Sequence, residues 1–251
     1  GIAGAAWNVK LMHIKVFQST GRGNSITIAE GVEYAYNNSA DIINMSFGSY
    51  AESSTLKTAL ETAYSNSFLV AAAGNDKIDI GPCIEGCFPF FPAAYSYVLG
   101  IWSAPPRNGF SNYDPSGPYQ TLWTGNLLNY ELKAPGTGIT STIPGGGYAT
   151  LNGTSMATPL VAGVLALYNE EHPNDSHELI FGNLLNTGFT AIPNGKSLNA
   201  IDAISVVPVP AVLPISVVIS DTINNQNGNG YWQPGETLNL FPLIKNYWGP
   251  T

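Results

Sequence analysis

The chain has 251 residues, of which 44% are hydrophobic and only 10% are charged, which fits one large α/β domain or a domain with an appendage. Its formal net charge is −8, with 9 Lys and Arg against 17 Asp and Glu, so no basic surface is expected for nucleic acid or for an anionic membrane. The longest apolar stretch is too short to cross a bilayer, and the chain does not begin with the pattern of a signal peptide.

The first hundred residues predict strands that alternate with helices. Apolar and β-branched runs indicate the strands, and apolar residues at helical spacing indicate the helices. The expected elements are a strand at 9–17, a helix at 28–36, a strand at 41–46, a helix at 56–64, and strands at 68–73 and 97–102. This order is typical of right-handed βαβ crossovers in a parallel sheet, where chemistry lies beyond the carboxyl ends of the strands. Gly21, Gly48 and Asn75 follow such ends and should share one rim.

The remainder predicts a loop-rich stretch, a hairpin, helices and a different tail. A hairpin is expected at 139–151, an apolar helix after Ser155 that Pro173 stops, and a helix at 176–185. The last packed segment ends at 205, and the proline-rich residues 206–214 predict an extended linker. Residues 215–251 contain two apolar runs, which we interpret as the beginning of a second, all-β module, cut off at its end. Within them, the oxygen-rich residues 221–230 favour a hairpin loop over a calcium site.

The sequence Gly-Thr-Ser-Met-Ala-Thr-Pro at 153–159 stands directly before the almost wholly apolar run of the buried helix. Ser155 therefore lies at the positive end of a helix dipole, which suits a nucleophile whose attack creates an oxyanion. Taken alone, Gly-Thr-Ser is also typical of an ordinary helix N-cap.

Four strings in the same order give the pattern a family resemblance. They are INMSFG at 43–48, AAAGN at 71–75, KAPG at 133–136 and GTSMATP at 153–159. Together they resemble the subtilisin-like serine proteases, over residues 1–205. The resemblance implies an α/β fold, a parallel-sheet catalytic domain that is N-terminally truncated to its C-terminal two thirds. It also implies hydrolysis of polypeptide substrates in a secreted protein.

The resemblance implies a role for each matching residue. Ser155 corresponds to the nucleophile and Asn75 to the oxyanion-hole donor, and Ala73 and Gly74 form a pocket wall. The residues implied to bind an extended substrate are Ser46, Phe47, Gly48, Gly21, Arg22, Gly23 and Thr154. Without the resemblance, residues 21–23 are a surface turn, 46–48 a strand end and Asn75 a turn residue. Phe90 falls near the family's pocket floor, where it either makes the pocket shallow or packs into the loop core.

The family also needs a histidine base and an aspartate that orients it, and the sequence shows neither in the family's context. The only histidines are His13, His172 and His177. We therefore expect both groups upstream of these residues and the chain alone to be inactive. The alternative is a pseudoenzyme that binds peptides without cleaving them. An acid-active sedolisin-type enzyme would carry aspartate at the oxyanion position, where this chain has Asn75. Leu160 replaces a histidine that many relatives carry there, but that histidine is not the base.

Cys83 and Cys87 lie in one loop, and their closeness favours a disulfide in an oxidising compartment over a metal site. No cofactor is expected for the chemistry and no metal ligand is assigned, although structural calcium is common in the family. The sequence predicts no oligomeric state.

Overall fold

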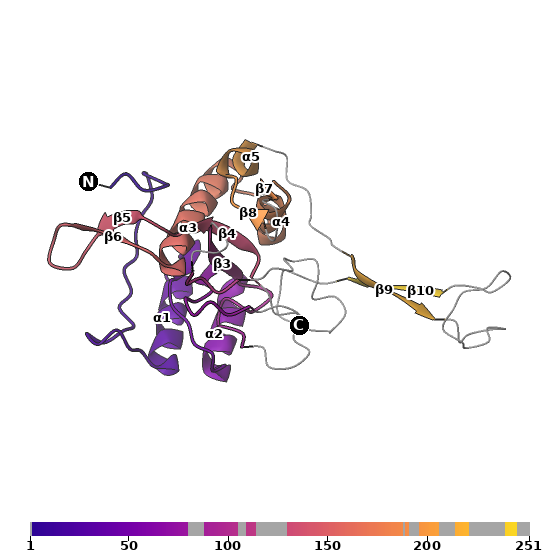
Figure 1. Cartoon of the computed structure of the whole chain (residues 1–251), viewed down its shortest axis with the longest axis horizontal. Coiled ribbons are helices and arrows are strands. Elements are labelled where there is room, and N and C mark those ends of the chain that lie inside the picture. The colour runs from indigo at the N-terminus through magenta and orange to yellow at the C-terminus, as the bar shows by residue number, and fades with distance from the viewer. Residues whose placement is uncertain are drawn as a thin grey trace.

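A six-stranded sheet with the order β1-β2-β3-β4-β8-β7 forms the centre of the fold (Figure 1). The computed structural model describes residues 2–79, 88–104, 109–113, 130–187, 189–190, 196–205, 214–220 and 239–244. The strands of this sheet are β1 (Ile42–Met45), β2 (Phe68–Ala72), β3 (Leu99–Ala104), β4 (Leu132–Pro135), β7 (Phe189–Thr190) and β8 (Lys196–Ser197). All neighbouring pairs are parallel except β7 and β8, so the expected parallel-sheet α/β fold is confirmed.

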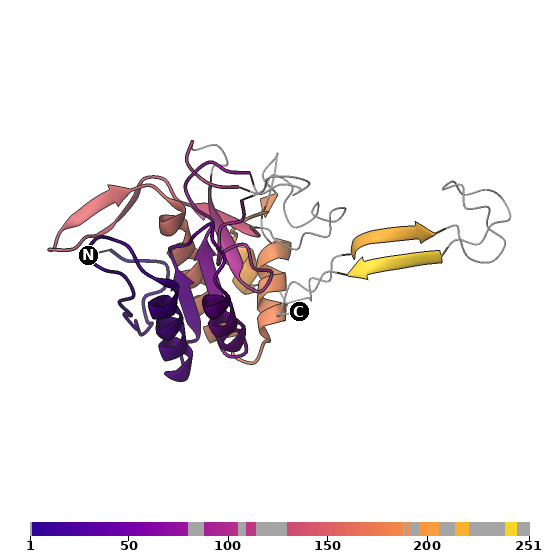
Figure 2. The same ribbon diagram turned by 90° about the horizontal axis from the view of Figure 1, so that it is seen from below.

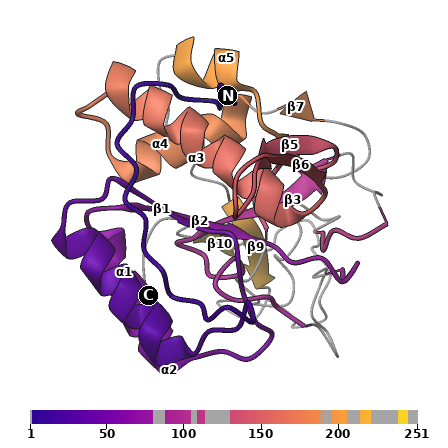
Figure 3. The same cartoon turned by 90° about the vertical axis from the view of Figure 1, so that its left-hand side faces the viewer.

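Helices cover both faces of the sheet, as Figure 3 shows. One face carries α1 (Ser25–Asn37) and α2 (Ser54–Tyr64), and the other carries α3 (Thr154–Glu171), α4 (His177–Thr187) and α5 (Ala200–Ser205). The first two begin at side-chain caps, because Asn24 Oδ1 accepts from the N–H of Thr27 at 2.8 Å and Ser53 Oγ accepts from that of Leu56 at 3.3 Å.

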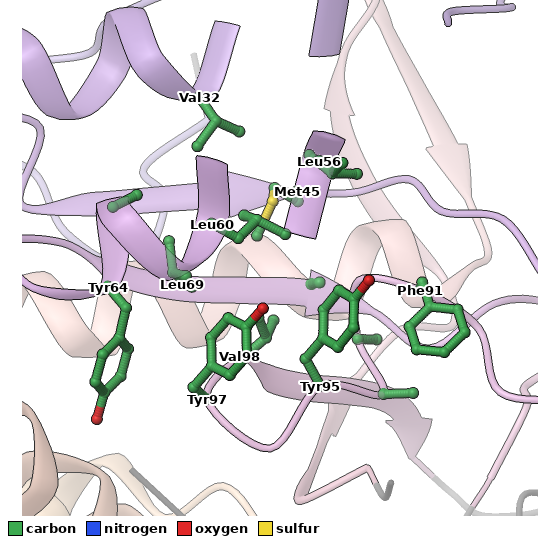
Figure 4. Close-up of a cluster of buried hydrophobic side chains, with 14 of the residues drawn as sticks. Val32, Met45, Leu56, Leu60, Tyr64, Leu69, Phe91, Tyr95, Tyr97 and Val98 are labelled. Carbon is green, nitrogen blue, oxygen red and sulfur yellow. The ribbon is translucent and has the colours of Figure 1, made fainter. Parts of the chain in front are cut away.

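The period-two alternation of the strands separates two hydrophobic cores. In β2, Leu69 and Ala71 point into the core under α1 and α2, whereas Phe68 and Val70 point into the core under α3 and α4. Figure 4 shows the first core, in which aromatic side chains such as Tyr95 lie below the aliphatic ones. Because both faces are covered, β2 is buried throughout, as its wholly apolar sequence predicts.

The strand expected at 9–17 is wrong: this segment joins no ladder. Its apolar side chains pack on a helix instead, since Ile14 and Val16 fill the space over Gly31 of α1. Val9, Leu11 and Met12 stay exposed. High β propensity was therefore not enough, because a strand needs a partner edge as well as suitable side chains. The strand expected at 97–102 exists as β3, beginning two residues later.

Two hairpins lie outside the central sheet. The first, β5 (Ile139–Thr142) and β6 (Tyr148–Leu151), matches the expected hairpin and projects from the body in Figures 1 and 2. The second pairs β9 (Pro214–Ser220) with β10 (Asn239–Ile244), close to where two strands were expected. Two strands do not establish an all-β module, so that module and the boundaries at 205 and 215 stay predictions. Residues 206–213 of the expected linker and the loop at 221–230 lie outside the described residues.

Candidate active site

The candidate site lies where β1 and β2 end and α3 begins. β1 continues into Ser46, β2 continues into Asn75, and Gly153 caps the amino end of α3. Hydrogen bonds that span 79 to 109 residues of sequence connect these three segments. The carboxyl rim of the sheet thus carries the segments that hold Gly48 and Asn75, as expected for an open parallel sheet. Gly21 was expected there as well, but it follows no strand, because residues 9–17 do not form one.

Ser155 is bound to the end of β1 by a reciprocal pair of hydrogen bonds. Its Oγ donates to the carbonyl of Ser46 at 3.0 Å, and Ser46 Oγ donates to the carbonyl of Ser155 at 3.1 Å. The second bond is possible because residue 159 is a proline inside α3. Proline has no N–H, so the carbonyl of Ser155, four residues earlier, has no helical donor. The proline therefore leaves a carbonyl that ties the nucleophile position to β1.

Thr154 fixes the orientation of the Asn75 amide. The Oδ1 atom of Asn75 accepts from the backbone N–H of Thr154 at 2.9 Å and from its Oγ1 at 3.1 Å. The same Oγ1 accepts from the N–H of Gly74 at 3.2 Å, and Thr154 is fully buried. Because two donors occupy the amide oxygen, the NH₂ group must point the other way. Thr154, predicted to contact substrate, holds a site residue in this structure.

Two donors flank one small space beside Gly153. A Cβ built on Gly153 would lie 3.6 Å from Asn75 Nδ2 and 3.7 Å from the backbone nitrogen of Ser155. The Ser155 N–H belongs to the first turn of α3, where N–H groups have no partner within the helix. The Sδ atom of Met156 also borders this space, 3.3 Å from the same Cβ position. The helix dipole makes the space favourable for negative charge. The arrangement can stabilise an oxyanion that forms next to Ser155 Oγ.

The two segments predicted to bind an extended chain are linked through Phe17. Its ring packs edge-on against Phe47, with 5.1 Å between centroids, and lies 2.9 Å from the position of a Cβ on Gly23. Residues 18–22 close a turn in which the N–H of Gln18 donates to the carbonyl of Arg22 at 2.9 Å. Gly21, Arg22 and Gly23 are exposed there. Their contact with substrate stays a prediction.

Phe90 occupies the space between the chain segments that follow β1 and β2. Its ring lies directly over Gly48, and 3.2 Å from the position of a Cβ on Gly74. It also packs edge-on against Tyr50, with 4.9 Å between centroids. The sequence left open whether this ring points inward. The structure places it between the two glycines, where it restricts the room beside Ala73 and Gly74.

Sequence reasoning missed a polar network behind Asn75. Tyr50 Oη donates to Asp76 Oδ2 at 2.6 Å, and Asn112 Nδ2 donates to Tyr50 Oη at 2.9 Å. Burial, with the hydrogen bond to Asp76, raises the pKa of Tyr50 to about 12. Asn112 lies in the stretch where the sequence predicted only loop, so no local periodicity singled it out.

None of the three histidines contacts Ser155. His13 is exposed on the N-terminal segment, and His177 has Nδ1 3.0 Å from the carbonyl of Tyr64. His172 follows the far end of α3, with Nε2 3.0 Å from the carbonyl of Ile204. A rise of 1.5 Å per residue puts it roughly 25 Å from Ser155. In the described structure, the Ser155 hydroxyl donates its hydrogen bond to the Ser46 carbonyl.

Only some of the other predicted features lie within the described residues. Cys83 and Cys87 lie outside the described residues, and so does any link between them. Within the described ranges, no group of three or more His, Cys, Asp or Glu side chains is placed to hold a metal ion. The helices of the described part include none that is long and apolar enough to span a membrane.

Comparison with known proteins adds an independent line of evidence. The model of the subtilase family matches residues 1–227. Alkaline elastase YaB of Bacillus sp. (strain YaB) is 38% identical over 187 residues, which cover 74% of this chain and 45% of that protein. Subtilisin E of Bacillus subtilis (strain 168) is 37% identical over 174 residues, 69% of this chain and 42% of that protein. The chain thus spans less than half the length of these relatives.

Two solved protease structures are also similar to this chain. A protease of Pseudoalteromonas arctica PAMC 21717 is similar with a TM-score of 0.67 and 31% identity, over 82% of this chain and 65% of that one. The prenylagaramide maturation protease PagA is similar with a TM-score of 0.60 and 26% identity, over 75% of this chain and 70% of that one.

Proposed function

This chain belongs to the subtilase family, and we propose that it forms part of a serine endopeptidase in which Ser155 is the nucleophile. The observation that carries the proposal is the pair of donors, Asn75 Nδ2 and the Ser155 N–H, that border the space at Gly153. Donors preset toward developing charge are the largest single contribution in many acyl-transfer enzymes.

The reaction would proceed by acyl transfer. Ser155 Oγ attacks the carbonyl carbon of the peptide bond, and its proton passes to a base as the C–O bond forms. The oxyanion moves into the space beside Gly153 and accepts from the two donors. The tetrahedral intermediate then expels the amine, which takes the proton from the base, and water hydrolyses the acyl-enzyme by the reverse sequence. We place the histidine base and its aspartate outside these 251 residues, because none of the three histidines reaches Ser155.

The substrate would be an extended polypeptide with a small side chain before the scissile bond. An extended chain binds by adding a strand to an exposed edge, and Ser46 to Gly48 continue β1 at the edge of the described sheet. The residue whose carbonyl meets Ser155 then lies between Gly48 and Gly74. Phe90 already fills much of that space, so alanine or glycine fits there and phenylalanine does not.

A pseudoenzyme is the second candidate, and one observation favours it. The Ser155 hydroxyl donates to a backbone carbonyl, which is not a base. Such a protein would retain the edge of β1 and the space between Gly48 and Gly74 without cleaving what it binds.

A fluorophosphonate probe separates the two candidates. The probe reacts only with an activated serine, so we expect it to label the complete gene product, with no labelling after Ser155→Ala and unchanged labelling after Ser141→Ala on the exposed β5 strand. Residues 1–251 alone should remain unlabelled. The loss of turnover without a base is of order 10⁶, a value measured on a subtilisin and borrowed here. Absence of labelling in the matured complete protein would establish the pseudoenzyme.

The same proposal includes secretion, a disulfide between Cys83 and Cys87, and chemistry that requires no cofactor. Support comes from the family membership and from the closeness of the two cysteines in one loop. Structural calcium stays unassigned.

A further inference from the structure

Asn112 is a fully buried asparagine whose hydrogen bonds surround the peptide units on both sides of Asn75. We propose that Asn112 is a positioning residue of the oxyanion hole, which holds the backbone of Asn75 so that its amide meets the developing charge. The proposal rests on the proposed peptidase function.

The amide oxygen and nitrogen of Asn112 each make two hydrogen bonds, to the backbone of residues 73–78 and to Tyr50. Nδ2 donates to the carbonyl of Ala73 at 2.8 Å and to Tyr50 Oη at 2.9 Å. Oδ1 accepts from the N–H groups of Asp76 at 3.0 Å and Ile78 at 2.9 Å. This pattern fixes which side-chain atom is oxygen and which is nitrogen, because the two backbone N–H groups require an acceptor.

The backbone of Asn112 adds a further bond, since its N–H donates to the carbonyl of Gly74 at 2.9 Å. The residues before Asn75 and after it are therefore held by one side chain and one peptide group. Gly74 has a φ of +100°, and a Cβ on it would collide with Asn112 Nδ2. The glycine and the asparagine fit together, and the turn that presents Asn75 depends on both.

The exposure of Asn75 explains why such a support matters. Asn75 is exposed, and within the described part of the chain its side chain is held through its oxygen, by Thr154. An exposed turn without internal anchors samples several backbone positions, whereas catalysis needs the donor in one. A misplacement of about 1 Å can cost on the order of 10²-fold in rate. Asn112 supplies the anchor through its bonds to the backbone of residues 73–78.

Asn183 provides the matched control. It is equally buried, and its Nδ2 donates to the carbonyl of Ala203, which joins α4 to α5 away from the site. Asn183→Ala removes an equally buried asparagine with fewer side-chain hydrogen bonds, so it controls for the loss of a buried amide and not for the size of the destabilisation. A purely structural role of Asn112 would lower Tm without a loss of kcat that depends on Asn75.

The test measures hydrolysis of an alanyl anilide by the complete protein and its variants, once fluorophosphonate labelling of the wild type has established the peptidase. We expect Asn112→Ala to lower kcat about 10- to 100-fold, with KM changed less than about twofold, since the support acts on a bond made only in the transition state. Asn183→Ala should lower Tm and leave kcat unchanged. In the Asn75→Ala background, Asn112→Ala should cost less than about threefold, because the donor it positions is gone.

Equal losses of kcat in the two backgrounds, or an unchanged kcat in Asn112→Ala, would overturn the positioning role. If Asn112→Ala does not fold, Asn112→Ser retains a polar group there and is subject to the same double-mutant test. If the wild type is not labelled, the peptidase proposal fails by itself. The crystallographic distance between Asn75 Nδ2 and the Ser155 nitrogen in Asn112→Ser then decides the positioning, because an unchanged distance would refute it.

Discussion

The two sides of Ser155 differ in how completely the described chain builds them. On the side of Asn75, the buried Thr154 orients the exposed Asn75 amide, and the buried Asn112 bonds the backbone that follows it. On the side toward which the hydroxyl points, the partner is the carbonyl of Ser46. Under the proposed function, charge stabilisation would depend on the packing of α3 against the sheet, whereas proton transfer would need a group from elsewhere. The two halves of the proposed machinery are structurally separable.

Removing the donor from the complete side should have the largest effect. Asn75→Ala in the complete protein should lower kcat about 10²- to 10³-fold with little change in KM, because the amide meets charge present only in the transition state. The size is that of removing the equivalent donor from a subtilisin and is borrowed from that enzyme. Steady-state hydrolysis of a peptide anilide measures it, with Asn66→Ala in the exposed turn after α2 as the control. Unchanged turnover would remove Asn75 from the oxyanion hole.

Removing the Phe90 side chain should have a smaller effect on turnover and should change substrate selectivity. Phe90→Gly should raise kcat/KM for phenylalanine relative to alanine before the scissile bond about 10- to 100-fold, since pocket contacts of this kind discriminate by such factors. Phe88→Gly is the matched control, because that ring is 58% exposed and lies two residues away. A ratio that stays constant in Phe90→Gly would show that this ring does not limit the pocket.

Loss of the hydrogen bonds of Tyr50 to Asp76 and Asn112 should have the smallest effect. It should change the stability of the fold at alkaline pH. The pKa of Tyr50 is raised from 10.0 to about 12, by burial first and then by Asp76, so the folded state holds this proton more tightly than the unfolded chain. The stability contributed by the neutral hydroxyl is present in full below pH 10 and is lost as the pH rises toward 12. Tyr50→Phe should therefore flatten the fall in the free energy of unfolding between pH 10 and 12.

Denaturant unfolding at several pH values measures that slope, with the exposed Tyr34→Phe as the control. Part of the slope will remain in Tyr50→Phe, because burial also raises the pKa of Tyr168 to about 12 and raises those of Tyr95 and Tyr97. A slope identical to that of the wild type would show that Tyr50 titrates alike in the folded and unfolded states.

The sequence predicted the elements whose signals are local. Apolar runs gave β2 and α3, and the Ala-Ala-Gly-Asn and Gly-Thr-Ser strings marked Asn75 and Ser155. It failed where the outcome depends on a distant partner. Residues 9–17 have the composition of a strand but pack on α1, and Asn112 makes its hydrogen bonds only because the fold brings it next to residues 73–78. Burial and pairing over long sequence distances are not encoded in a local pattern.

Pro159 has a consequence for any attempt to transplant the segment that carries Ser155. A helix that gives up one of its own hydrogen bonds must find the missing donor in another part of the chain, and here Ser46 supplies it from β1. The smallest unit that could be transplanted is therefore discontinuous. It consists of the first turn of α3 and the end of β1, 109 residues earlier in the sequence. A graft of Gly153 to Pro159 alone would carry the serine and leave its anchor behind.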